Sequence, residues 1–304
     1  MKWIFLLILG VVCISTSAIL VTVAGTSPTT AALYRNLFAA LIWLILWRYS
    51  TPFRPCSRKD TADSMRVAPF LWRFANTYGV AGIFTALGLA FAVDLWAWHR
   101  CIALVGAGPA TLLGNLQVVF IALLGSLVFG EVLKPYYWIG SSLALLGIGL
   151  LTLTRGVSLD VVLGLVMGIL TALTYAIFLI FLKLLGHYDL EPAQTLFWVA
   201  VSTLVFLAVP FYLEADIRVP DRRTLVVLLI HAFISSVLGW WLIVKALRHI
   251  PVAQTATILL LQPLLTSIWG HLFLGQYLDG LQGVGILVAL VGIRLANWEG
   301  CHAV

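Results

Sequence analysis

The stretch Leu116–Leu150, LQVVFIALLGSLVFGEVLKPYYWIGSSLALLGIGL, decides the fold, because a related stretch follows 145 residues later. This second stretch, Leu261–Leu295, reads LQPLLTSIWGHLFLGQYLDGLQGVGILVALVGIRL, and 12 of the 35 aligned positions are identical. Leucine-rich segments match by composition alone, whereas a shared glutamine and several glycines in register indicate an internal duplication. The informative pairs are Gln117/Gln262, Gly125/Gly270, Gly130/Gly275, Gly140/Gly285, Ala144/Ala289, Gly147/Gly292 and Ile148/Ile293.

The composition places both copies in a lipid bilayer. Hydrophobic residues make up 62% of the chain and charged residues 10%, against about 25% charged residues in a soluble domain. Uncharged runs of roughly 20 residues recur, which is the length of helix that crosses a hydrocarbon core. We therefore expect an all-α integral membrane protein with ten spans: Trp3–Ala24, Ala31–Trp47, Tyr78–Trp98, Pro109–Phe129, Tyr137–Thr154, Val161–Leu182, Thr195–Leu213, Thr224–Val244, Val252–Leu274 and Leu281–Leu295.

Ten spans divide into two five-helix repeats, residues 1–155 and 156–304. Because five is odd, the second copy enters the membrane from the opposite side, which gives an inverted repeat. Inverted repeats are typical of alternating-access transporters, whose solute site lies between the halves. Separate short-loop helices are also favoured by turn residues such as Lys134-Pro135 and Asp279-Gly280.

The basic residues predict an orientation. The only long connection, residues 48–77, carries six of them and is expected to be cytoplasmic by the positive-inside rule. Both termini are then cytoplasmic, with 12 basic residues inside and 6 outside, in a bacterial-type cytoplasmic (inner) membrane. We expect the first apolar run, after Lys2, to be a retained helix rather than a cleaved signal peptide. The six are Arg48, Arg54, Arg58, Lys59, Arg66 and Arg73.

Several classes of protein are disfavoured by the same residues. The net charge of +6 is dispersed over the loops and forms no basic patch with interleaved aromatic residues, so no nucleic-acid partner is expected. The four cysteines have neither zinc-ligand spacing nor a disulfide pattern. No phosphate-binding glycine loop is present, so we expect no cofactor and no ATP hydrolysis. The cysteines are Cys13, Cys56, Cys101 and Cys301.

A family resemblance rests on motifs in both halves. The chain resembles the drug/metabolite transporter superfamily, with two tandem EamA-type repeats that cover almost all of it. The resemblance implies a ten-helix inner-membrane carrier, with exporters of amino acids and metabolites as its commonest characterised members. Its carriers are Ser27-Pro28, Tyr34-Arg35-Asn36, Ala92–Trp96, Ala107–Thr111, Asn115, Phe129-Gly130-Glu131 and Gly140, then Pro251-Val252-Ala253, Leu261-Gln262-Pro263 and Gly275-Gln276.

Two positions depart from the family pattern. Val118 stands where the first repeat often has proline, which predicts a straighter fourth span. Gln276 replaces the acidic residue that is usual after Gly275, which argues against a role that needs a carboxylate in both halves.

Arg35 and Asp94 are the most informative side chains, because a charge inside an apolar span is costly unless it is paired or hydrated. At 1.5 Å per residue, both lie about 10 Å from the outer ends of their spans. Two interpretations stay open. Either Arg35 binds a substrate carboxylate and Asp94 an ammonium group, or the two form a permanent bridge between helices. Asp94 is also a candidate for carrying a coupling proton.

Other polar and aromatic residues are candidates for the transport path. Trp98 shares a helical face with Asp94, and Trp240 could supply an aromatic wall, although tryptophan is also routine near membrane interfaces. Amide groups at mid-membrane depth suit either solute binding or contacts between helices. They belong to Asn115, Gln117 and Gln262. His231 and His271 lie inside spans, where they could titrate or bridge helices.

A further set of residues has an expected structural role. Small residues four apart in the fifth and tenth spans let helix backbones approach closely. Glu131 is expected to neutralise a nearby base or to cap the segment that follows it. The set comprises Gly130, Glu131, Gly140, Gly275 and Gly285.

These expectations converge on a secondary transporter that exports small metabolites, such as neutral or aromatic amino acids, by alternating access. The alternatives are a passive facilitator or channel, which also needs a polar path, and a polytopic membrane enzyme, which needs a denser cluster of ionisable groups. The expected partners are a small-molecule substrate and membrane lipid. The sequence leaves open the substrate, the direction of transport, proton coupling and the oligomeric state, for which a monomer is plausible.

Overall fold

The computed structural model describes residues 2–50, 69–105, 110, 113–152, 160–188, 190–214, 220–275 and 280–296. This part of the chain is almost entirely helical and contains no β-strand, which confirms the all-α class. The elements are α1 (Lys2–Ser15), α2 (Ser17–Ala24), α3 (Pro28–Ser50), α4 (Pro69–Val105), α6 (Gln117–Phe129), α7 (Pro135–Thr152), α8 (Asp160–Leu184), η1 (Leu185–His187), α9 (Pro192–Leu213), α10 (Arg222–His231), η2 (Ala232–Gly239), α11 (Trp240–Leu247), α12 (Val252–Leu259), α13 (Leu261–Leu274) and α14 (Gly280–Ala296).

Some residues of the sequence analysis lie outside the described ranges, and their expected roles stay predictions. They are Arg54, Cys56, Arg58, Lys59, Arg66, Ala107, Gly108, Pro109, Thr111, Gln276, Asp279 and Cys301.

The helices have the length and composition of membrane spans. Within the described residues, seven helical segments are long and apolar enough to cross a bilayer, and the shorter apolar helices Leu113–Phe129 and Gly283–Ala296 accompany them. Large apolar side chains face outward, as lipid permits, with Leu127 71% and Phe273 70% exposed. The chain is therefore a polytopic integral membrane protein, and each apolar segment predicted above overlaps a helix.

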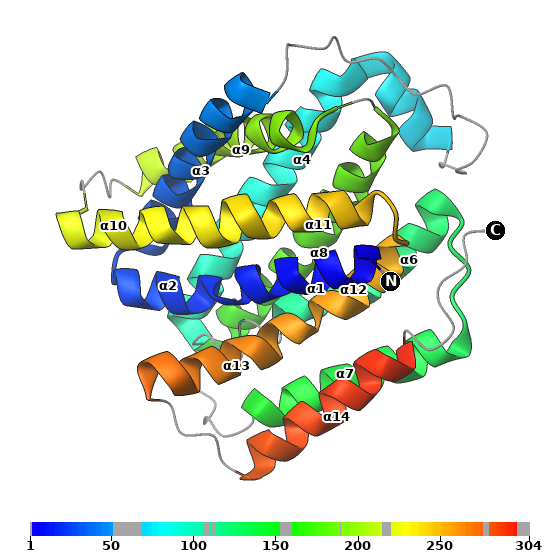
Figure 1. The fold of residues 1–304 in the computed structure, drawn as a ribbon. Coiled ribbons are helices and arrows are strands. Elements are labelled where there is room, and N and C mark those ends of the chain that lie inside the picture. The colour runs from blue at the N-terminus through cyan, green and yellow to red at the C-terminus, as the bar shows by residue number, and fades with distance from the viewer. Residues whose placement is uncertain are drawn as a thin grey trace.

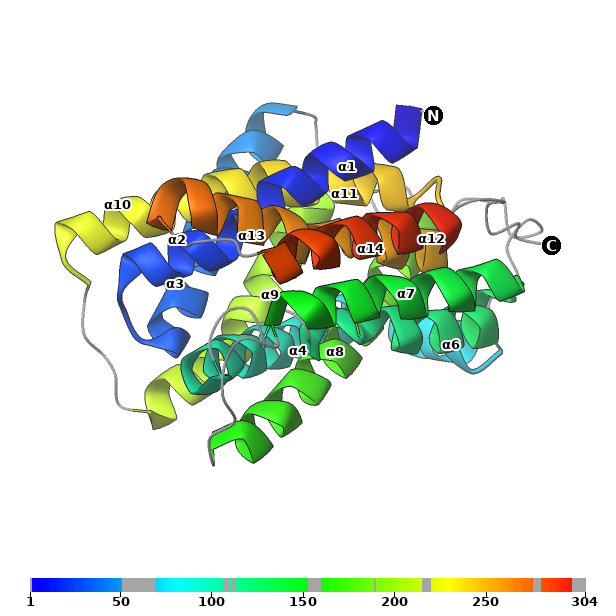
Figure 2. The ribbon, with the colours of Figure 1, turned by 90° about the horizontal axis from the view of Figure 1, so that it is seen from below.

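The helices form a bundle in which elements from the two halves of the chain alternate (Figures 1 and 2). The continuous rod α10–η2–α11 packs beside α1 and α2, and α3 packs on α9. The extended helix α4 packs on α8 and α9, while α7 and α14 form a pair at one edge. Every one of these contacts joins the first half of the sequence to the second.

The pair α7 and α14 meets through glycines at repeat-equivalent positions. A Cβ atom built on Gly140 would lie 2.6 Å from the carbonyl oxygen of Gly292, and one on Gly147 would lie 2.6 Å from that of Gly285. No side chain fits at such distances, so the backbones are in direct contact. Because Gly140 corresponds to Gly285 and Gly147 to Gly292, the two helices present the same surface to each other in antiparallel orientation.

Gly130 and Gly275, another repeat-equivalent pair, end α6 and α13 in the same way. Their φ angles are 64° and 63°, in the left-handed region that favours glycine at a helix C-terminus. Both copies therefore stop the helix at the same residue of the repeat.

Among the described residues, five spans depart from a regular α-helix, one of them α4, which is kinked at Gly79, where φ is 61°. A turn at Thr16 separates α1 from α2, a turn at Leu116 precedes α6, and a turn at Leu260 separates α12 from α13. The eighth span widens into the π-helix η2. The expectation that Val118 straightens the fourth span was wrong, because the break lies two residues earlier, where the amide of Val119 bonds to the carbonyl of Leu116. The chain makes this turn without proline.

Candidate functional site

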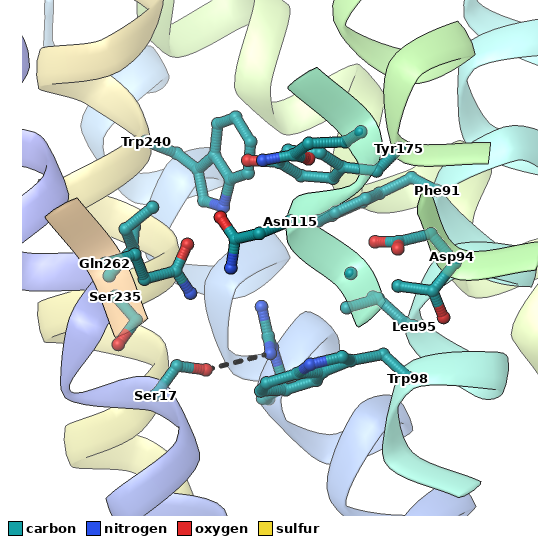
Figure 3. A pocket seen from close by; sticks show the side chains of 15 residues that line it. Ser17, Phe91, Asp94, Leu95, Trp98, Asn115, Tyr175, Ser235, Trp240 and Gln262 are labelled. Atoms are coloured by element: carbon teal, nitrogen blue, oxygen red, sulfur yellow. Dashed lines mark hydrogen bonds between the residues drawn. The ribbon is translucent and has the colours of Figure 1, made fainter. Parts of the chain in front are cut away.

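The interrupted helices surround a central cavity of about 80 Å³ (Figure 3). The turn at Thr16 presents Ser17 to it, the turn at Leu116 presents Asn115 and Gln117, and the turn at Leu260 presents Gln262. Interrupted helices are how membrane transporters bring polar groups to mid-membrane depth. All seven residues proposed for the transport path line this one cavity: Arg35, Asp94, Trp98, Asn115, Gln117, Trp240 and Gln262.

Arg35, on α3, is 4% exposed and has more donors than partners. Its Nη1 donates to Ser17 Oγ at 3.3 Å, drawn as the dashed line in Figure 3. Its Nε has no hydrogen-bond partner within the described part of the chain. A guanidinium carries five N–H donors, and buried donors are nearly always satisfied. Arg35 therefore keeps a buried donor for which the described residues supply no acceptor.

Asp94, on α4, is the acidic counterpart on another wall of the cavity and is 5% exposed. Figure 3 shows its carboxylate across the cavity from Ser17, the residue that holds Arg35. Arg35 and Asp94 interact electrostatically, but among the described residues no ion pair within 4.0 Å joins them. The permanent bridge considered above is thus not formed, and the two charges are held apart.

Aromatic rings line the cavity from more than one side (Figure 3). Trp98 and Trp240 line it, together with Phe91 and Tyr175. Behind them Phe178 stacks on Phe91 at 4.3 Å between ring centroids and meets the edge of Trp240 at 5.1 Å. Phe178 lies one helical turn beyond Tyr175 along α8, so the rings of Phe91, Tyr175, Phe178 and Trp240 form one packed cluster next to the cavity. The cavity offers a flat apolar surface beside its two charges.

Repeat-equivalent amides meet at the cavity. Gln117 and Gln262 occupy the same position of the two copies, and both line the cavity from the first turns of α6 and α13. Asn115 lies just before α6, also lines the cavity, and is labelled near the middle of Figure 3. The halves of the chain therefore contribute matching polar groups to one space.

Sequence reasoning missed several lining residues, because hydroxyl and aromatic side chains are common in apolar spans and carry no periodic signal. The missed residues are Ser17, Phe91, Thr171, Tyr175 and Ser235. Two tryptophans of the eighth and ninth spans have other contacts. Lys245 Nζ lies 3.6 Å from the ring centroid of Trp241, and Trp269 donates to Ser15 Oγ at 2.8 Å.

Glu131 forms a second charged cluster, away from the cavity. Its carboxylate accepts from the backbone amides of Val252 at 2.7 Å and Ala253 at 3.0 Å, and it pairs with Lys183 at 3.3 Å. Lys183 Nζ also donates to the carbonyl of Ile250 at 2.8 Å. Glu131 does neutralise a base and cap a helix, but the capped helix is α12 of the other half and not α7, the next helix along the chain.

A third cluster, around Glu214, joins the ends of α3, α4 and α9. The Glu214 carboxylate pairs with Arg100 at 2.5 Å and accepts from Trp96 Nε1 at 2.9 Å and Thr29 Oγ1 at 2.5 Å. Burial acts to raise the pKa of this carboxyl, but the hydrogen bonds from Thr29, Arg100 and Trp96 together hold the pKa below its usual value. Glu214 is therefore ionised at neutral pH and fastens the two halves at this end.

Comparison with known proteins gives the same architecture. A solved structure titled only "Crystal structure of protein" superposes with a TM-score of 0.77, covering 98% of this chain and 97% of that chain at 12% identity, which shows the fold alone. Two curated relatives, from Salmonella typhimurium and Escherichia coli K12, are 26% and 25% identical over 220 residues. Each alignment covers 68% of this chain and 74% of the relative, and each relative is named a probable amino-acid metabolite efflux pump.

The family model for the EamA-like transporters matches twice, over residues 1–153 and 162–298. The two matches coincide closely with the two halves defined by the internal repeat, and together they account for nearly the whole chain. The chain belongs to the EamA-like transporter family and is a transporter rather than an enzyme.

Proposed function

We propose that this transporter exports neutral or aromatic amino acids by alternating access. The observation that carries the proposal is the pair of buried, opposite, unjoined charges on the walls of one cavity. Arg35 has an unused donor at Nε and is bonded to Ser17. Asp94 lies across the cavity from Ser17. A zwitterion supplies one complementary group to each of them.

The chemistry of each charge specifies its partner. A guanidinium binds a carboxylate through two parallel hydrogen bonds, and Asp94 matches an α-ammonium group. Keeping such charges apart and unpaired in the membrane is costly, and a bound zwitterion removes much of that cost. The flat rings of Trp98 and Trp240 then suit an apolar or aromatic side chain. The names of the two curated relatives agree with an amino-acid metabolite.

Alternating access requires two halves of the protein that can move against each other around a fixed solute site. A ten-helix inverted repeat is supported by the antiparallel glycine contact of α7 with α14 and by the meeting of Gln117 and Gln262 at the cavity. With both termini in the cytoplasm of a bacterial-type cell, the Glu131–Lys183 cluster lies at the inner end of the bundle.

The aromatic cluster around Phe178 favours a carrier over a channel. A channel needs a continuous wet path, whereas Phe91, Phe178 and Trp240 pack together beside the cavity, with Phe178 stacked on Phe91 and both rings edge-on to Trp240. Movement of solute past this cluster requires the helices to move. Saturable counterflow separates the two alternatives, since a channel does not exchange one labelled solute for another.

The test is counterflow in proteoliposomes of the purified protein. Phenylalanine and leucine are compared with their carboxamides, which lack the carboxylate, and with the corresponding des-amino acids, which lack the ammonium. We expect saturable exchange of the amino acids only. Equal exchange of all three ligand classes, or none of the amino acids, would contradict the proposal. Transport measured with and without an imposed proton gradient tests whether Asp94 carries a coupling proton. Labelling of single cysteines introduced at each terminus, from each side of the membrane, tests the orientation.

A further inference from the structure

Arg35 is held by a buried chain of two hydrogen bonds. Ser17 Oγ, on α2, accepts a hydrogen bond from Arg35 Nη1. The same Ser17 Oγ lies 2.7 Å from Nε2 of His231, at the end of α10. His231 is fully buried and Ser17 is 5% exposed. The chain Arg35–Ser17–His231 therefore joins three helices, α3, α2 and α10, behind one wall of the cavity.

The direction of these bonds follows from what each group can do. A guanidinium only donates, so Ser17 Oγ accepts from Arg35. The Ser17 hydroxyl hydrogen is then available, and His231 Nε2 is the other polar atom bonded to Ser17 among the described residues. The arrangement that leaves the fewest polar groups without a partner has Ser17 donating to His231 Nε2. The His231 proton then sits on Nδ1, which has no partner within the described chain.

The atom that Ser17 holds on Arg35 decides which edge of the guanidinium stays open. Ser17 occupies Nη1, whereas Nε has no partner among the described residues. The N–H groups of Nε and Nη2 point in parallel along the same edge of the planar group and form the fork that a carboxylate accepts. The chain of hydrogen bonds leaves that fork open.

We infer that His231 is a positioning residue, which acts through Ser17 to present the Nε/Nη2 edge of Arg35 to a carboxylate. This inference rests on the proposed function and names the group that fixes its carboxylate site. The second buried imidazole near Arg35 does not share the task. His99 Nδ1 bonds instead to the carbonyl of Leu95 at 2.6 Å, within its own helix.

Two near-isosteric variants separate positioning from packing. His231→Gln can place an amide oxygen close to the position of Nε2, where it can accept from Ser17, whereas the shorter side chain in His231→Asn cannot reach that position. Ser17→Ala removes the middle link. Thr203→Val is the control, because Thr203 is buried on α9 and, among the described residues, its hydroxyl donates to the carbonyl of Val199 in its own helix.

The measurement is the Kd of each variant for phenylalanine and for phenylalaninamide. We expect His231→Asn and Ser17→Ala to weaken phenylalanine binding about tenfold, as for the loss of one hydrogen bond to a charged group. Binding of the amide stays unchanged, and His231→Gln stays within about threefold of the wild type. Equal losses for both ligands, or His231→Gln behaving like His231→Asn, would overturn the inference while leaving the proposed function standing. If wild-type protein fails to prefer phenylalanine over its amide, the proposed function and the inference both fall.

A second readout does not depend on any ligand. In protein with ¹⁵N-labelled histidine, the resonances lost in His231→Gln identify His231. We expect them to report a neutral ring with its proton on Nδ1 and Nε2 as an acceptor, and to shift in Ser17→Ala. A proton on Nε2 would overturn the proposed direction of the chain.

Discussion

The molecule buries two pairs of opposite charges, and it treats them in opposite ways. Glu131 and Lys183 are in contact, and the carboxylate also caps α12 through two backbone amides. Arg35 and Asp94 are equally buried but stand apart on the walls of a cavity. In one pair both charges have charged and backbone partners within the protein, whereas in the other pair Arg35 bonds to Ser17 and keeps Nε unused among the described residues.

We interpret the Glu131–Lys183 pair as a structural contact between helices and the Arg35 and Asp94 pair as the proposed binding site. Satisfied charges stabilise one arrangement of helices, and breaking them leaves an uncompensated charge in a dry interior. Unsatisfied charges cost stability, and under the proposed function a bound zwitterion would complete them. Exposure cannot tell the two pairs apart, because all four residues are buried. The inventory of partners can.

The largest expected effect is on the Glu131–Lys183 pair. Glu131→Ala should destabilise the protein by about 3–5 kcal/mol, because it removes the counter-charge of the buried Lys183 ammonium and the cap of α12. Thermal unfolding in detergent measures the loss. The double variant Glu131→Gln/Lys183→Met should recover much of it, since neither charge remains. A small effect of Glu131→Ala would show that water already solvates Lys183.

Asp94→Asn should produce the reverse pattern. The affinity for a zwitterionic amino acid should fall by a factor of about 10–100, the equivalent of about 1.5–3 kcal/mol for a hydrogen bond to a charged group. Thermal stability should not fall, because Asp94 makes no ion pair with the described part of the chain. Binding of a des-amino analogue serves as the control. A large drop in unfolding temperature would make Asp94 a structural contact instead.

The uncharged glycine contact between α7 and α14 should also stabilise the fold. Gly140→Ala should cost about 1–3 kcal/mol through overpacking, since its Cβ would lie 2.6 Å from the carbonyl oxygen of Gly292. Gly149→Ala in the same helix is the matched control, because a Cβ there meets nothing within 4 Å. If the two variants unfold at the same temperature, α7 and α14 do not pack as described.

The smallest expected effect is the pH response of the cluster around Glu214. The folded-state pKa of Glu214 is lowered, so its stabilising effect is fully present above the usual glutamate pKa of about 4.3 and is lost as the pH falls through the folded value. Unfolding temperatures measured between pH 7 and pH 3 should decline more steeply in wild-type protein than in Glu214→Gln. Parallel curves would mean that Glu214 is not held by Thr29, Trp96 and Arg100.

The sequence predicted the helical class and much of the cavity, for one physical reason. In an apolar span a charge or an amide is conspicuous, so Arg35, Asp94 and Gln262 could be selected without a structure. Ser17 and Tyr175 could not, because such residues also occur throughout lipid-facing and packed helices. The break at Thr16 has no proline or glycine beside it, whereas Pro263, three residues after Leu260, removes one backbone hydrogen bond at the second break.

Partners distant in sequence were also beyond prediction. The expected cap of Glu131 was the next helix, whereas the observed one begins at Val252, 121 residues away. Likewise, His231 was recognised as a residue inside a span, but its bond to Ser17 spans 214 residues. Such contacts depend on how the two halves interlock, which no local pattern encodes.

The contact between α7 and α14 has a consequence for the origin of the chain. A surface that is complementary to itself needs no second, separately evolved surface to mate with. Half of the polypeptide, made as an independent five-helix protein and inserted in both orientations, would already carry the glycine surface that packs against an oppositely inserted second copy. Fusion of two such genes would then preserve an assembly that existed before the halves were ever linked.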